Sequence, residues 1–197
     1  MNAITFAHSP FWPIAIGFFG LGTGYLIWGG SALFEWPPPS HEVDRSIGIW
    51  GLCMNGFMQF ITGVYLMVGL TWFGVFAGAA PLYMAALAFT AYGVHWFAIG
   101  TRRIIGSSPQ PEAWMAICFL LLSFLGVLVF FDAGDVPVGI LFIGLTLIYL
   151  TEVPTNFGVF PGGHRWIGFW QFVTGVWLMY LTYATTFNFA LGAHWWL

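Results

Sequence analysis

A threonine, a tyrosine and a histidine interrupt one long apolar stretch. Thr90, Tyr92 and His95 fall inside the uncharged run 79–99. Hydroxyl and imidazole groups form hydrogen bonds, and inside lipid each of them needs a partner or a water-filled cavity. Tyr92 and His95 are three residues apart and therefore share one face of a helix. We expect this face to line a narrow polar path through a bilayer.

His95 is the one deep histidine, and its imidazole belongs to the side-chain class that titrates near neutral pH. It could sense pH or relay a proton, or it could be a neutral ring bonded to a nearby carbonyl. Replacing it with phenylalanine should then remove any steep pH dependence of the path. The other histidines lie near segment ends or in loops, so we expect no haem between two deep histidines.

Two glutamines and a repeated glycine pattern add further polar and close-packing positions. Gln59 and Gln171 lie in the middle of apolar segments, where each must bond another helix or a passing solute. Both interpretations stay open for Gln59, while a structural role is favoured for Gln171. Paired glycines seven residues apart share one helix face and allow close helix contacts. These are Gly17 and Gly24, Gly56 and Gly63, and Gly168 and Gly175.

The composition is that of a membrane protein. Of the 197 residues, 59% are hydrophobic and only 6% are charged, against about 25% charged residues in soluble domains. Six apolar segments of bilayer-spanning length predict an all-α membrane protein with six transmembrane helices in one domain. The expected helices cover residues 11–34, 47–70, 79–101, 113–131, 136–153 and 165–189.

The few charges give an expected orientation and exclude several partners. The chain has no lysine, and its four arginines fall in or beside the loops after the first, third and fifth helices. The positive-inside rule then places those loops in the cytoplasm and both termini outside. A net charge of −3 gives no reason to expect a nucleic-acid partner. No metal-ligand spacing and no nucleophile paired with a base appears, so we expect no metal, no cofactor and no enzyme activity.

Four stretches of the chain resemble motifs of one known family. Residues 88–96 read Ala-Phe-Thr-Ala-Tyr-Gly-Val-His-Trp and resemble that family's Ala-Phe-Thr-Ser-Tyr-Gly-x-Phe-Trp motif. Residues 56–63 are similar to its second-helix Gly-x-x-Gln-x-x-x-Gly motif. Residues 9–18 and 166–188 resemble its Asn-Pro-Ala-Pro opening followed by Gly-Phe and its last helix. The order and rough spacing agree over nearly the whole chain. On these motifs the chain resembles the acetate uptake transporters, which include the succinate–acetate permeases.

The resemblance implies a six-helix protomer with its own pore, commonly assembled as a homohexamer in the cell's inner membrane. The family moves small monocarboxylates such as acetate, and in some members succinate, in a proton-coupled or channel-like manner. Its hydrophobic constriction of Phe, Tyr and Leu corresponds here to Phe18, Tyr92 and Leu145. Gln59, Thr90 and His95 would then lie along the substrate path.

Two other functions remain open from the residues themselves. The chain could be a non-transporting accessory subunit of a larger membrane complex, using its glycine-rich faces to bind partner helices. It could also form a pore for a small neutral solute such as urea or ammonia, because hydrogen-bond donors beside an apolar constriction suit such molecules. The absence of an arginine from the middle of any segment favours weak, fast binding of a carboxylate over tight binding.

Overall fold

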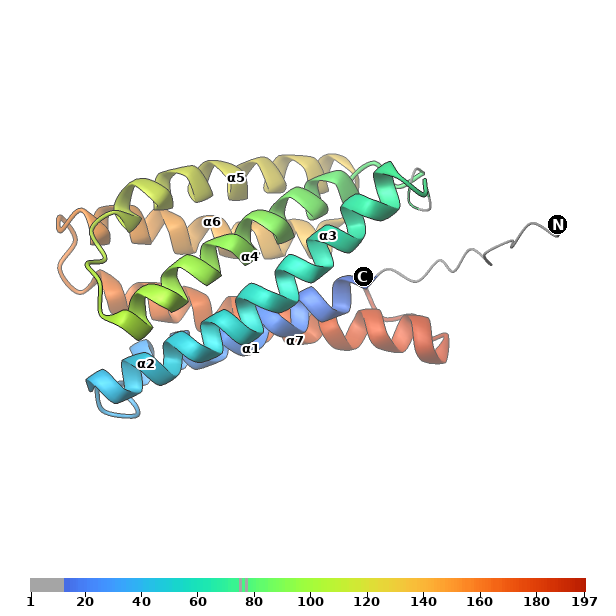
Figure 1. Cartoon of the computed structure of the whole chain (residues 1–197). Coiled ribbons are helices and arrows are strands. Elements are labelled where there is room, and N and C mark those ends of the chain that lie inside the picture. Colours follow the sequence, from blue (N-terminus) through green and yellow to red (C-terminus); the bar gives the residue numbers. More distant parts are fainter. Residues whose placement is uncertain (1–12, 75, 77) are drawn as a thin grey trace, which may run out of the picture.

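The computed structural model describes residues 13–74, 76 and 78–197. In that part of the chain six long helices form one bundle, with the second helix divided into α2, a π-helical stretch η1 and α3 (Figure 1). The expected all-α fold is therefore confirmed. The helices are α1 (Ile14–Phe34), α2 (His41–Trp50), η1 (Gly51–Phe57), α3 (Met58–Thr71), α4 (Leu82–Ile105), α5 (Glu112–Asp132), α6 (Val136–Asn156) and α7 (Gly163–Leu191).

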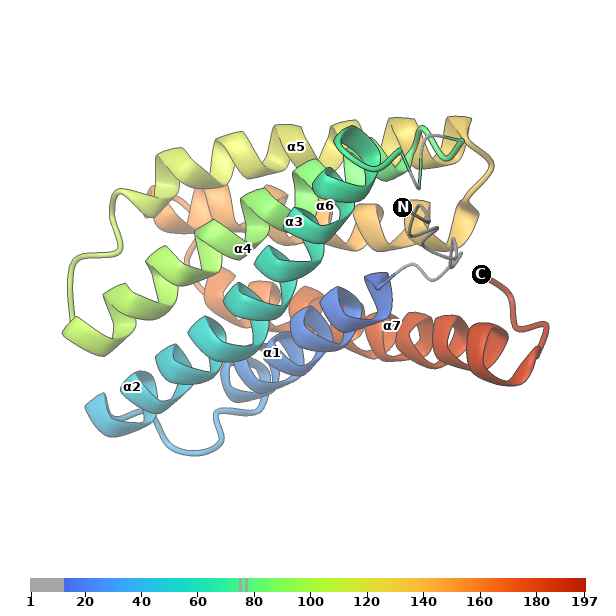
Figure 2. The same ribbon diagram turned by 45° about the vertical axis from the view of Figure 1, so that its right-hand side comes forward.

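Five helical spans in the described residues are long and apolar enough to cross a membrane: α1, α2 through α3, α4, α5 and α6. The remaining long helix, α7, has 29 residues and packs alongside α1 for most of its length (Figures 1 and 2). Its polar residues, such as Arg165 and Gln171, lower its mean hydropathy. The protein is thus a multi-pass membrane protein whose helices match the bilayer thickness.

Several helix ends differ from the expected bounds, each for a local reason. The second helix begins at His41, because the Ser40 side chain accepts a hydrogen bond from the Val43 backbone N–H and caps it. Helix α4 begins at Leu82 and continues to Ile105, where Arg102 and Arg103 complement the helix dipole.

Helix α6 does not stop at Val153, because Pro154 removes only one backbone hydrogen bond and the turn continues to Asn156. Helices α5 and α7 also extend slightly further than expected. Helix α5 gains Glu112 and Asp132, and α7 runs from Gly163 to Leu191. The expected start of the first helix, residues 11 and 12, lies outside the described residues.

Glycines let the helices of the bundle touch closely. A side chain at Gly24 would overlap the buried Asn55 amide of η1, and one at Gly63 would overlap Thr90 on α4. Gly17 lies against the Phe89 ring, and Gly56 against Phe97. Helices α1 and α7 meet where Gly168 and Gly175 pack against α1. Small residues at such crossings are how membrane helices bring their backbones together.

The two ends of the bundle carry different charges. At one end, on the left in Figure 1, lie the C-terminal ends of α1, α4 and α6 and the N-terminal ends of α2, α5 and α7. Arg103 forms an ion pair with Asp44 there at 2.6 Å, and Arg102 pairs with Glu112. All four arginines belong to this end, whereas the described charged residues at the opposite end are Asp132 and Asp135.

Candidate translocation pathway

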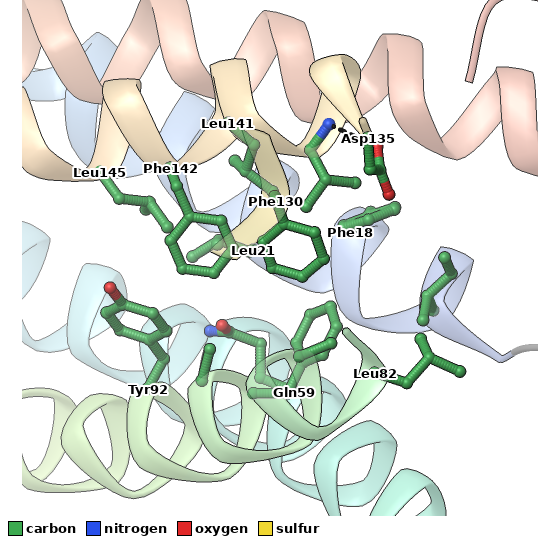
Figure 3. Close-up of a pocket in the computed structure, with 15 residues that line it drawn as sticks. Phe18, Leu21, Gln59, Leu82, Tyr92, Phe130, Asp135, Leu141, Phe142 and Leu145 are labelled. Atoms are coloured by element: carbon green, nitrogen blue, oxygen red, sulfur yellow. Dashed lines mark hydrogen bonds between the residues drawn. The ribbon is translucent and has the colours of Figure 1, made fainter. Parts of the chain in front are cut away.

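An apolar cavity lies between α1, α3, α4, α5 and α6 at the end of the bundle that lacks arginines (Figure 3). Its volume is about 60 Å³. Apolar side chains make up most of the wall, with Gln59, Tyr92 and Asp135 as its polar members. The labelled side chains of Figure 3 surround a shared space, with Asp135 at one end and Tyr92 toward the other.

A second cavity, which we call the polar vestibule, opens at the arginine end. It has a volume of about 120 Å³. Polar and charged side chains from α1, α4, α5, α6 and α7 contribute to its wall. They are Tyr25, His95, Trp96, Arg102, Arg103, Glu112, Tyr149, Glu152, Asn156, His164 and Gln171.

The two cavities follow the same faces of three helices. On α4 the lining passes from Ala88 and Tyr92 in the apolar cavity to Trp96 and Ile99 in the vestibule. On α1 it passes from Phe18 and Leu21 to Tyr25, and on α6 from Leu145 to Tyr149. Residues three or four positions apart lie on the same face of a helix. The two cavities therefore follow each other along the length of the bundle.

Tightly packed side chains separate the cavities. Leu21, Tyr25, Tyr92, Leu145 and Tyr149 are each 1–2% exposed. The rings of Tyr92 and Tyr149 stack at a centroid distance of 6.1 Å. These residues form a closed, largely apolar constriction in the middle of the bundle.

The structure brings together most of the residues expected along the path. Phe18, Tyr92, Leu145 and Gln59 line the apolar cavity (Figure 3), and His95 lines the vestibule. Phe18 lies about one helical turn away from the constriction. The residues that α1 contributes to the constriction are Leu21 and Tyr25.

Thr90 lies outside both cavities and instead occupies the contact between α3 and α4. Its hydroxyl donates to the Ala86 carbonyl at 2.8 Å and packs against Gly63. Thr90 is two residues from Tyr92, which turns it about 200° around the helix, away from the cavities.

Tyr92 belongs to a hydrogen-bond chain that ends on α5. The Ser123 hydroxyl lies 2.7 Å from the Tyr92 hydroxyl and 2.6 Å from the Phe119 carbonyl. Because the carbonyl can only accept, Ser123 donates to Phe119 and Tyr92 donates to Ser123. The Tyr92 ring is thereby fixed in orientation. Ser123 was missed by the sequence analysis, since nothing local links it to a residue 31 positions earlier.

Gln59 is fully buried, with one half of its amide bonded and the other half free. Its Nε2 donates to the Asn55 carbonyl at 3.0 Å, and its Oε1 has no hydrogen-bond partner among the described residues. The amide points into the apolar cavity in Figure 3. Gln59 therefore offers a hydrogen-bond acceptor inside an otherwise apolar space.

His95 is enclosed by aromatic rings. Its imidazole centroid lies 4.6 Å from Phe119, 5.6 Å from Trp96 and 6.0 Å from Tyr149. Within the described part of the chain neither ring nitrogen has a hydrogen-bond partner. The structure therefore does not show the expected hydrogen bond from the His95 ring to a nearby carbonyl. That His95 senses pH or relays a proton stays a prediction.

Asp135 caps the N-terminus of α6 at the outer end of the apolar cavity. Its Oδ1 accepts a hydrogen bond from the Val138 backbone N–H at 3.1 Å. Burial raises the pKa of the Asp135 carboxyl, and the bond from Val138 lowers the pKa by a smaller amount. The carboxyl thus becomes neutral at a higher pH than an exposed aspartate does.

Comparison with known proteins identifies the fold. No family model and no curated protein sequence matches the chain. Among solved structures, the bacterial acetate channel SatP matches with a TM-score of 0.70, at 16% sequence identity. The match covers 93% of this chain and 96% of SatP. The arrangement of helices around the two cavities is therefore that of a SatP-like fold.

Proposed function

We propose that this protein is a membrane channel or transporter for small monocarboxylic acids such as acetate. The observation that carries this proposal is the pair of aligned cavities on either side of a closed apolar constriction. The likeness to the acetate channel SatP supports it. SatP, whose fold the chain shares, is an acetate channel, and we propose a channel or transporter rather than an enzyme for this chain as well.

The size and chemistry of the apolar cavity favour a small acid with one carboxyl group. A cavity of about 60 Å³ holds about four or five water-sized groups, which fits the four heavy atoms of acetate. None of the described residues around it is basic, so a bare carboxylate would be costly there. A neutral acid can place its methyl group on the apolar wall and donate its O–H to Gln59. A dicarboxylate such as succinate is disfavoured, because this wall would leave its second carboxyl group without a partner.

The membrane domain, its orientation and its assembly can be proposed from the charges and the exposed apolar surface. We propose that residues 1–197 form a single transmembrane domain in the inner membrane, with the vestibule facing the cytoplasm according to the positive-inside rule. Many large apolar side chains of α5 are exposed, including Leu121, Phe124 and Leu128. Such a surface suits lipid or further copies of the chain, in keeping with a homo-oligomer, which the family resemblance suggests is a hexamer.

Transport by purified protein in liposomes tests the proposal. We expect labelled acetate to enter faster than into empty liposomes, and faster at pH 5.5 than at pH 7.5 because more of the acid is neutral. Succinate should enter no faster than in empty liposomes. Tyr92→Ala and Phe18→Ala should change the acetate rate, whereas Thr90→Val, outside the path, should not. Folded protein that passes neither acid would remove the proposal, and entry of urea alone would favour a pore for neutral solutes.

The charge at the mouth of the apolar cavity should slow the arrival of acetate anions, which reach this mouth before they take up a proton from the solvent and enter as the neutral acid. Asp135→Asn keeps a capping side chain but removes the negative charge, and we expect acetate entry at pH 7.5 to rise about threefold. The gain should shrink as the pH falls, because the raised pKa of Asp135 makes the wild-type carboxyl neutral too. Asp132→Asn, in the same turn but not lining the cavity, serves as the control. An equal gain in both variants would show a general surface-charge effect.

A further inference from the structure

Three buried hydrogen-bond donors without partners line the vestibule next to the constriction. Tyr25 and Trp96 are each 1% exposed, and His95 is 6% exposed. Within the described residues, the Tyr25 hydroxyl, the Trp96 indole nitrogen and both His95 ring nitrogens lack any hydrogen-bond partner. Buried polar groups are almost always paired, so three unpaired ones along one cavity wall require an explanation.

The three side chains form a connected group. The Trp96 ring centroid lies 5.7 Å from Tyr25 and 5.6 Å from His95. Tyr25 comes from α1, and the other two are neighbours on α4. Leu21 and Tyr92, one turn before them on the same helices, belong to the apolar cavity. The donors therefore lie where the vestibule meets the constriction, to which Tyr25 itself belongs.

We propose that Tyr25, His95 and Trp96 form a subsite that binds one carboxylate group, a step that rests on the proposed function above. The indole N–H can only donate, and the tyrosine O–H and one imidazole N–H can donate as well. Donors from three neighbouring side chains match a carboxylate, which has about four acceptor positions and no hydrogen to give when ionised.

The charges nearby suit a weakly held anion. Arg103 lies over the Trp28 ring, 4.0 Å from its centroid, and Trp28 in turn meets Trp96 edge to face at 4.7 Å. The Nη1 of Arg103 is paired with Asp44, whereas its Nε has no hydrogen-bond partner among the described residues, so Arg103 adds positive potential and one more donor to the vestibule wall. Glu152 lines the same vestibule and accepts a hydrogen bond from Asn156, and when it is ionised its charge opposes tight binding of an anion. Weak binding lets a solute leave as readily as it enters.

The subsite makes the two halves of the path chemically different. In the apolar cavity Gln59 offers an acceptor, the Tyr92 hydrogen is committed to Ser123, and Asp135 is acidic. That side suits a neutral acid. The donors in the vestibule suit the ionised form, so the solute binds there as the anion.

Binding of acetate to the wild-type protein and to donor-deleted variants tests the subsite. With protein in lipid nanodiscs at pH 7, saturation-transfer NMR of the acetate methyl protons measures weak dissociation constants directly. We expect Tyr25→Phe and His95→Phe each to raise the dissociation constant about five- to tenfold, because a donor to a charged group is lost. Tyr65→Phe, on the exposed side of α3, should leave it unchanged.

Thermal unfolding of the same variants separates binding from a structural role. Removing an unpaired buried donor removes a desolvation penalty, so Tyr25→Phe and His95→Phe should melt at the wild-type temperature or above it. Wild-type dissociation constants in both variants would overturn the subsite while leaving the proposed function intact. Weaker binding together with a clearly lower melting temperature would assign these residues a structural role instead.

Acetamide in the same assay distinguishes a carboxylate from a neutral carbonyl. We expect acetamide to bind more weakly than acetate and to be less affected by the two substitutions. Equal binding and equal loss for both ligands would overturn the carboxylate assignment. Failure of acetate to bind the wild-type protein at all would overturn both the subsite and the proposed function.

Discussion

Ala88→Leu is expected to reduce acetate entry into liposomes at least about tenfold, because a side chain that fills the apolar cavity closes the proposed route. Ala88 is 4% exposed and lines the apolar cavity one turn before Tyr92. The three added carbons extend into a space of about 60 Å³. Because the new atoms enter existing space, the melting temperature should change little even though the rate of acetate entry falls strongly.

The neighbouring residue provides the control for this block. Leu87 is 42% exposed and does not line either cavity. Leu87→Phe adds a comparable number of atoms on the outer face of the same helix, and acetate entry should remain at the wild-type rate. If Ala88→Leu folded normally and still carried acetate at that rate, the solute would not pass through this cavity.

Gly24→Ala is expected to have the largest effect on stability. The added methyl group would overlap the side chain of Asn55, which is fully buried where η1 crosses α1. Neither the backbone of α1 nor the packed side chains around Asn55 can move easily to make room. We therefore expect the free energy of unfolding to fall by about 2–3 kcal/mol. Thermal unfolding in detergent should show the melting temperature falling by about 5–10 °C.

Two further variants separate this contact from a general effect of replacing glycine in α1. A side chain at Gly30 would meet only Phe172, at 3.9 Å, so Gly30→Ala should be neutral or slightly stabilising. The double variant Gly24→Ala with Asn55→Ala removes the overlap and should recover most of the lost stability. Equal melting temperatures for Gly24→Ala and Gly30→Ala would contradict this close contact.

The sequence by itself determined the helical architecture and several of the cavity residues. Long uncharged runs identify membrane helices because lipid leaves no other partner for the backbone. The i, i+3 spacing of Tyr92 and His95 predicts one common face of α4, and in the structure Tyr92 lines the apolar cavity while His95 lines the vestibule. Helix ends were less predictable, since the Ser40 cap depends on backbone geometry that composition does not specify.

Only the tertiary structure decided which polar groups face each other. Helical periodicity says which residues share a face, but the direction of that face depends on how the helices pack. Thr90 therefore belongs to the contact with Gly63, while Tyr25, in an unremarkable stretch of α1, joins Trp96 beside the constriction. The bond between Tyr92 and Ser123 links helices that are distant in sequence. Such contacts arise from the packing of whole helix surfaces, which no single stretch of residues encodes.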